Sequence, residues 1–108
     1  MFFNKKKKIE VKKAEQDFLE ELYSFVLEPA ITDRERKIGL MAKKDLEKGR
    51  YSVAVINQLS ASFQQEAVSK KLTAEAYKFY KNLNPTLDKI APIGTNRGAM
   101  AVNRSYLD

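Results

Sequence analysis

Residues 38–83 read IGLMAKKDLEKGRYSVAVINQLSASFQQEAVSKKLTAEAYKFYKNL. Apolar side chains recur in this stretch every three or four positions, a spacing typical of helices with one buried face. The inward positions of one such helix are Ile56, Leu59, Phe63 and Ala67. No segment shows the alternation of apolar and polar residues that indicates a β-strand of any length. The sequence therefore predicts an all-α fold.

Local signals indicate where the helices begin and end. Thr32 is followed three residues later by Glu35, the spacing of a capping box, in which each side chain binds an amide that the first turn leaves free. Gly49 is placed to take the left-handed conformation that ends many helices. Ser52 and Thr73 belong to the residue types that cap helix N-termini, so we expect them to begin the next two helices.

An apolar stripe nearer the N-terminus predicts the first helix. Its members are Val11, Ala14, Phe18, Leu22 and Phe25. Pro29 ends this helix because proline lacks the amide that the next turn needs. The chain is therefore expected to form helices at about 9–28, 32–48, 52–71 and 73–84. Four amphipathic helices with short connections favour an antiparallel up-and-down four-helix bundle, here over residues 1–92.

The end of the chain changes in character. In the fourth helix we expect Tyr77, Tyr80 and Leu83 to face inward, with Phe79 beside them. Asn84-Pro85 is expected to break that helix, although residues 86–90 could form another turn before Pro92. Residues 93–108 hold two of the four glycines and no helical period, which predicts a flexible or loosely packed C-terminal tail. The apolar residues of this tail leave open that it folds back onto the bundle.

The third predicted helix is unusual because few of its residues are charged. Between Tyr51 and Lys70 the one charged residue is Glu66. Such a helix is either buried over a wide arc or presents a neutral surface to a partner. We favour a helix enclosed by three neighbours.

The composition limits the chemistry that the chain can perform. Its 108 residues, 12.4 kDa, suffice for one domain, and it contains neither cysteine nor histidine. Disulfides, thiol nucleophiles and Ser-His pairs are thereby excluded, and transition-metal sites are disfavoured. We expect a protein that is not an enzyme, with no catalytic residues, no metal and no cofactor.

Positive charge is concentrated towards the C-terminus. The chain carries a net charge of +6, and its last 60 residues hold eight Lys and Arg against four Asp and Glu. The expected partner-binding residues are Lys70, Lys71, Lys78, Lys81, Lys89, Arg97 and Arg104. A face towards an anionic membrane or an acidic protein is favoured. Recognition of a specific nucleic acid is not expected, because Tyr77 and Tyr80 are assigned to the core and the third predicted helix carries no arginine. A basic helical nucleic-acid-binding or adaptor protein remains the alternative.

The N-terminus bears on the location of the protein. The Lys5–Lys8 run is followed by Ile9-Glu10-Val11 rather than by the apolar run of a secretory signal. The longest unbroken apolar stretch, Val53 to Ile56, is far too short to span a membrane. A cytoplasmic location is expected.

Two parts of this sequence carry a resemblance to a known family. The run Ala42-Lys43-Lys44-Asp45-Leu46-Glu47-Lys48-Gly49 resembles the end of helix two in immunity proteins against pediocin-like (class IIa) bacteriocins, the enterocin A immunity group. The neutral helix with Leu59 and Phe63, and then Lys71-Leu72-Thr73 opening a short helix, are similar to the same group. The resemblance covers a little under half of the chain.

The resemblance implies an antiparallel four-helix bundle in the cytoplasm of a Gram-positive bacterium. Members of the family protect a cell from a pore-forming peptide that acts through the membrane part of the mannose phosphotransferase system. They are thought to engage this receptor from inside the cell, at the inner face of the membrane, once the bacteriocin has bound. Recognition is attributed to the C-terminal half. The resemblance carries over five residues as bundle positions near this half, and not as contacts: Lys71, Leu72, Tyr77, Tyr80 and Leu83.

Overall fold

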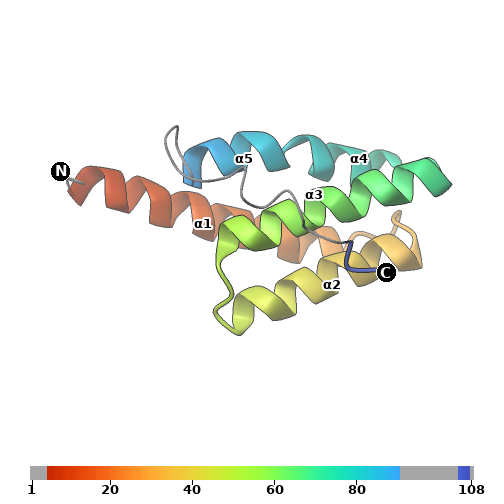
Figure 1. Cartoon of the computed structure of the whole chain (residues 1–108), viewed down its shortest axis with the longest axis horizontal. Helices are drawn as coiled ribbons and strands as arrows, with labels where there is room; N and C mark the ends of the chain where they lie inside the picture. The colour runs from red at the N-terminus through yellow and green to blue at the C-terminus, as the bar shows by residue number, and fades with distance from the viewer. Residues whose placement is uncertain (1–4, 91–104, 108) are drawn as a thin grey trace.

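The chain folds into helices, as a computed structural model that describes residues 5–90 and 105–107 shows (Figure 1). The helices are α1 (Lys5–Val26), α2 (Asp33–Glu47), α3 (Ser52–Ser69), α4 (Ala74–Lys81) and α5 (Leu83–Ile90). Within the described residues there is no strand. The predicted all-α class is confirmed.

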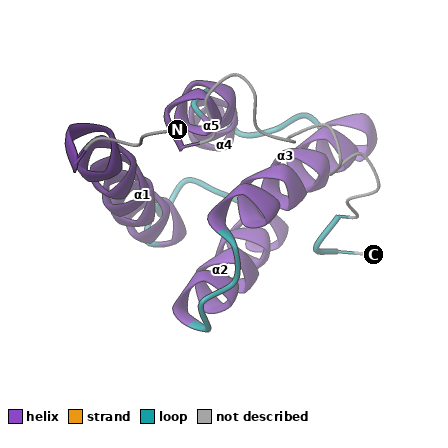
Figure 2. Ribbon diagram, turned by 60° about the vertical axis from the view of Figure 1, so that its left-hand side comes forward, coloured by secondary structure: helices purple, strands orange, loops and turns teal. Residues whose placement is uncertain are grey.

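The chain reverses direction at each of its three loops. α1 runs towards the right of Figure 1, α2 returns to the left, α3 runs right again, and α4 with α5 returns along the top. α4 and α5 follow one another with a single residue, Asn82, between them, and together take one place beside α1 and α3 (Figures 1 and 2). α3 packs against α2, α4 and α5. Because α4 and α5 take one place, α3 packs against two neighbouring positions rather than the three that were expected.

Four phenylalanines form the aromatic part of the core. The rings of Phe25 and Phe79 are stacked, with centroids 4.5 Å apart and planes at 12°. Phe63 meets Phe25 edge-on at 5.7 Å and Phe79 edge-on at 6.0 Å, and Phe18 lies 6.2 Å from Phe79. Offset and edge-to-face arrangements are the favoured geometries of aromatic pairs. These contacts join α1, α3 and α4 in one core.

The break after α4 lies earlier than expected, at Asn82 rather than at Asn84-Pro85, and the further turn that residues 86–90 could form is part of α5. Pro85 does not end the helical structure, which continues in α5 as far as Ile90. Proline is tolerated in a first turn because the amide that it lacks would have no partner there. The Thr86 amide donates to the Asn82 carbonyl at 3.1 Å. This hydrogen bond joins the residue between the two helices to the first turn of α5.

The expected inward face of the fourth predicted helix was right for Leu83, which is buried, and wrong for Tyr77. Tyr77 is 52% exposed, whereas Phe79 is only 7% exposed and Tyr80 is half-buried. Phe79 faces inward because it stacks on Phe25 of α1. On α3, Ala67 was expected inward but is exposed as well.

Two of the predicted helix boundaries are confirmed by their hydrogen bonds. The Glu35 amide donates to Thr32 Oγ1 at 3.0 Å and the Thr32 amide to Glu35 Oε1 at 2.9 Å, which completes the capping box. Gly49 has φ of +88°, the left-handed conformation that favours glycine. The Gly49 amide donates to the carbonyl of residue 46, and the Arg50 amide donates to the carbonyl of residue 45. These two hydrogen bonds end α2.

Two other boundaries differ from the expectation. α1 begins at Lys5, earlier than expected, and ends at Val26. Ser52 does not cap α3: Tyr51 holds the N-cap position without a side-chain hydrogen bond. The Ser52 hydroxyl donates instead to Glu15 Oε2 at 2.7 Å, so it links α3 to α1.

Candidate functional site

The predicted lysines are all exposed, but the fold brings only some of them together. Lys70 and Lys71 follow the end of α3, Lys78 and Lys81 belong to α4, and Lys89 lies apart on α5. Lys81 Nζ is 5.3 Å from the centroid of the Tyr77 ring. Tyr77 and Lys71 line the same hollow between α3 and α4. Arg97 and Arg104 lie outside the described residues.

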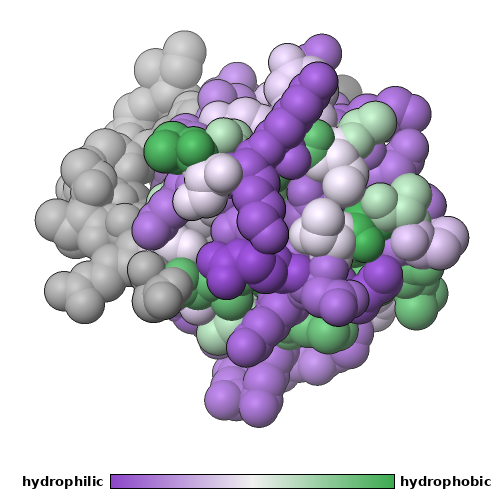
Figure 3. Space-filling model, turned by 90° about the vertical axis from the view of Figure 1, so that its right-hand side faces the viewer, coloured by the Kyte–Doolittle hydropathy of each residue, from purple (hydrophilic) through white to green (hydrophobic). Residues whose placement is uncertain are grey.

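This hollow, the α3–α4 groove, has a volume of about 590 Å³. Its lining consists of Ala67, Lys71, Leu72, Ala74, Tyr77 and Tyr80. Apart from the lysine and the two hydroxyls, these side chains present carbon. The groove belongs to the end of the molecule that faces the viewer in Figure 3, where separate hydrophobic side chains stand among hydrophilic ones. The site thus combines an apolar recess with cationic neighbours.

The α4 wall of the groove is fixed by one buried glutamate. Thr73 caps α4, since its Oγ1 accepts from the Ala76 amide at 3.2 Å. The Thr73 amide and hydroxyl donate to Glu35 Oε2 and Oε1 at 3.0 and 2.8 Å. Glu35 is 2% exposed and also accepts from the Thr32 amide. One carboxylate therefore joins the N-termini of α2 and α4.

The α3 wall is held by a second carboxylate. Arg34 of α2 donates through Nε and Nη2 to the two carboxylate oxygens of Glu66, at 2.8 and 3.0 Å. Glu66 is 6% exposed, and two-point pairs of this kind fix orientation as well as charge. Gln64 of α3 donates to the hydroxyl of Tyr80 of α4 at 3.1 Å, which links the two helices. The acidic residue of α3 is thus engaged by an arginine, and the rim of the groove remains basic.

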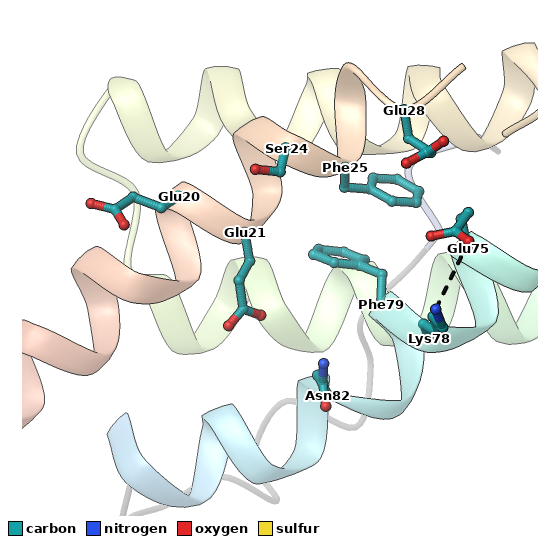
Figure 4. Close-up of a pocket in the computed structure, with 9 residues that line it drawn as sticks. All are labelled: Glu20, Glu21, Ser24, Phe25, Glu28, Glu75, Lys78, Phe79 and Asn82. Carbon is teal, nitrogen blue, oxygen red and sulfur yellow. Dashed lines mark ion pairs between the residues drawn. The ribbon is translucent and has the colours of Figure 1, made fainter. Parts of the chain in front are cut away.

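The opposite side of α4 is different in charge. A second hollow of about 450 Å³, the α1–α4 groove, lies there (Figure 4). Its lining consists of Glu20, Glu21, Ser24, Phe25, Glu28, Glu75, Lys78, Phe79 and Asn82. Lys78 Nζ lies 4.0 Å from Glu75 Oε1, so this predicted site residue belongs to the acidic side. Nothing in the sequence signals this groove, because Glu75 lies about fifty positions from the glutamates of α1.

The described end of the C-terminal tail packs on the face formed by α2 and α3. The Tyr106 amide donates to Ser62 Oγ at 2.7 Å, and the Tyr106 hydroxyl donates to Asp45 Oδ2 at 2.9 Å. Arg50 pairs with the same Asp45 oxygen at 2.6 Å. Tyr106 and Leu107 pack against the core cluster. The mobility expected of the tail stays a prediction, and residues 105–107 have fixed contacts.

The tail contact shifts two ionisation equilibria. Burial, and then the hydrogen bond to Asp45, raise the pKa of Tyr106 well above its usual range. Burial alone would raise the pKa of Asp45, but the hydrogen bonds from Arg50 and Tyr106 outweigh it and hold that pKa below its ordinary value.

A spectrophotometric titration tests the Tyr106 contact. The raised pKa favours the protonated phenol in the folded chain, so its contribution to stability is present below about pH 10 and is lost as the pH rises through the folded pKa. We expect absorbance at 295 nm to show one tyrosine ionising later than a free phenol. Tyr106→Phe should remove this late component. A titration curve that is the same for both proteins would contradict the contact.

The described residues carry no group of three or more acidic residues arranged to hold a metal ion. In that same part of the chain no helix has the length and apolar character needed to cross a membrane.

Comparison with known proteins gives a family match. The model of the bacteriocin immunity protein family matches residues 13–87, a range that runs from within α1 into α5 and includes both walls of the α3–α4 groove. No curated protein and no solved structure was found to match the chain.

Proposed function

The chain belongs to the bacteriocin immunity protein family, and from this premise we propose that it protects a cell from a class IIa pore-forming peptide. The observation that carries the proposal is the extent of the family match, 13–87, which takes in the greater part of the helical body. The family is not one of enzymes, and we propose that this protein acts by binding alone.

The proposed mechanism is engagement of a membrane receptor from the cytoplasm of a Gram-positive cell. The receptor is the membrane part of the mannose phosphotransferase system with bacteriocin bound, and the protein prevents its lethal opening. Exposed lysines around α4 support a position at the inner face of the membrane, because each near-surface Lys contributes about 1 kcal/mol of attraction to anionic lipid. An antiparallel four-helix bundle would serve as the rigid frame, and a mobile tail would order when the partner binds.

The function is tested by expressing the protein in a sensitive strain and challenging the cells with a panel of pediocin-like peptides. We expect protection against at least one peptide of the panel. If the protein is expressed in soluble form and protects against none of these peptides, the proposal is refuted. Strongly salt-dependent binding to DNA fragments would favour the nucleic-acid-binding alternative instead.

A charge-matched pair of variants tests the predicted binding residues. In the first variant Lys70, Lys71, Lys78 and Lys81 become Gln. In the control Lys12, Lys37, Lys44 and Lys48 become Gln, so the net charge of the two proteins is the same. We expect the first to tolerate a peptide concentration lower by about tenfold or more, the size of a lost binding contribution near 1.4 kcal/mol. Equal loss in both would show that only net charge matters.

A further inference from the structure

We infer that the α3–α4 groove binds a large apolar side chain carried by an acidic segment of a partner protein. The inference rests on the proposed function and deepens it, because it states the chemistry of the segment that the protein engages. Three features of the groove carry it: an open apolar lining, a rim of one sign of charge, and walls that are already fixed.

The lining is open to a ligand and mostly apolar. Ala67 and Ala74 are exposed small residues, and Tyr77 is 52% exposed. A volume of about 590 Å³ lies within the usual range of ligand pockets, about 300–1,000 Å³. The recess is therefore large enough for an aromatic or branched aliphatic anchor.

The charges around the groove select an acidic partner. Lys71 is the one charged residue in its lining, and Lys81 lies over the Tyr77 ring at its rim. Glu66 is held by Arg34, and Glu75 lines the groove on the opposite side of α4. An anchor flanked by Asp or Glu would meet cations on this side, whereas a basic segment would be repelled.

A protein segment fits the groove better than a lipid surface. The apolar lining is recessed between two helices, and only Val68 and Tyr77 stand out from α3 and α4 as large exposed hydrophobic residues. The lysines can hold the protein near an anionic bilayer, but the four glutamates that line the other side of α4 would oppose the close, flat contact that a bilayer needs to fill the groove. A narrow segment can enter the groove without approaching them.

The walls are organised before any partner arrives. Glu35 fixes the start of α4 through Thr73, and Arg34 fixes the end of α3 through Glu66. A preformed recess lowers the cost of ordering that binding otherwise carries. The groove can therefore recognise an anchor without rearranging its helices.

Filling the groove is the first test. Ala67→Trp places an indole in the recess from an exposed position, and Leu40→Trp adds the same group on α2 as a matched control. We expect the first variant to lose protection by about tenfold or more and the second to keep it, with both melting within a few degrees of the parent protein. Full protection by a folded Ala67→Trp protein would overturn the inference.

A second pair of variants tests the charge requirement. Lys71→Glu with Lys81→Glu reverses the rim, and Lys37→Glu with Lys44→Glu makes the same change in net charge on α2, outside the predicted binding residues. We expect the rim variant alone to lose about tenfold or more of protection. Equal losses would show that the groove has no particular requirement for cations.

Crosslinking identifies the occupant and separates this inference from the proposed function. The photoreactive residue p-benzoylphenylalanine replaces Ala74, and the protein is irradiated with membranes of a sensitive strain and bacteriocin. We expect an adduct with a protein segment that holds an aromatic or aliphatic residue beside Asp or Glu. Adducts with lipid only, with a basic segment, or with nothing would overturn the inference. Absence of protection by the parent protein would refute the function and leave the crosslinking result to decide on the groove.

Discussion

Replacing Phe63 with alanine is expected to lower the free energy of unfolding by about 4 kcal/mol, because the substitution removes a fully buried ring and leaves a cavity. Phe63 has no exposed surface, and its ring meets those of Phe25 and Phe79 edge-on. Three helices lose a shared contact at once. A loss of this size is a large fraction of the 5–15 kcal/mol that is typical of small domains.

Urea denaturation followed by circular dichroism measures this effect. Phe63→Leu is the control, since it keeps most of the apolar volume and should cost roughly half as much. A loss below about 1.5 kcal/mol for Phe63→Ala, the range of volume-conserving exchanges, would mean that the neighbouring rings close the cavity.

Glu35→Ala is expected to cost about 3 kcal/mol, because it removes a buried charged acceptor and leaves three partly buried donors without their partner. The donors are the amides of Thr32 and Thr73 and the Thr73 hydroxyl. The loss of the capping box alone accounts for about 1 kcal/mol. The rest of the lost stability comes from the hydrogen bonds between Glu35 and Thr73, which join α2 to α4.

Urea denaturation combined with amide hydrogen exchange distinguishes these two parts. In Glu35→Ala we expect faster exchange at Thr32 and Thr73. Glu35→Gln keeps one carbonyl oxygen as an acceptor, so its loss of stability should be smaller. Unchanged exchange at Thr73 would show that the contact between α2 and α4 contributes little.

Features that depend on neighbouring residues were predicted well from the sequence. The Thr32–Glu35 capping box and the left-handed Gly49 need only a few adjacent positions. Ser52 has the right residue type for a cap, but its hydroxyl binds Glu15, 37 positions away. Tertiary contacts of this kind override local preference, and no local pattern reports them.

The sequence predicted which part of the chain carries most of the positive charge. It did not predict the shape of the candidate site. Counting basic residues identified the lysines around α4, all of them exposed. The rotation of α4 decides which of them share a surface, and it follows from the stacking of Phe79 on Phe25. Lys78 consequently lines the acidic α1–α4 groove, while Lys71 lies on the opposite side.

The shortness of α4 has a consequence for anyone who wishes to imitate this surface. α4 has eight residues, whereas isolated helices in water need about 12–15 to be even marginally stable. Its shape is supplied from α2 by Glu35, which lies far away along the chain. A linear synthetic peptide copied from this region would not reproduce the surface, and an antibody raised against such a peptide would recognise the denatured protein better than the native one. A mimic must carry the start of α2 as well.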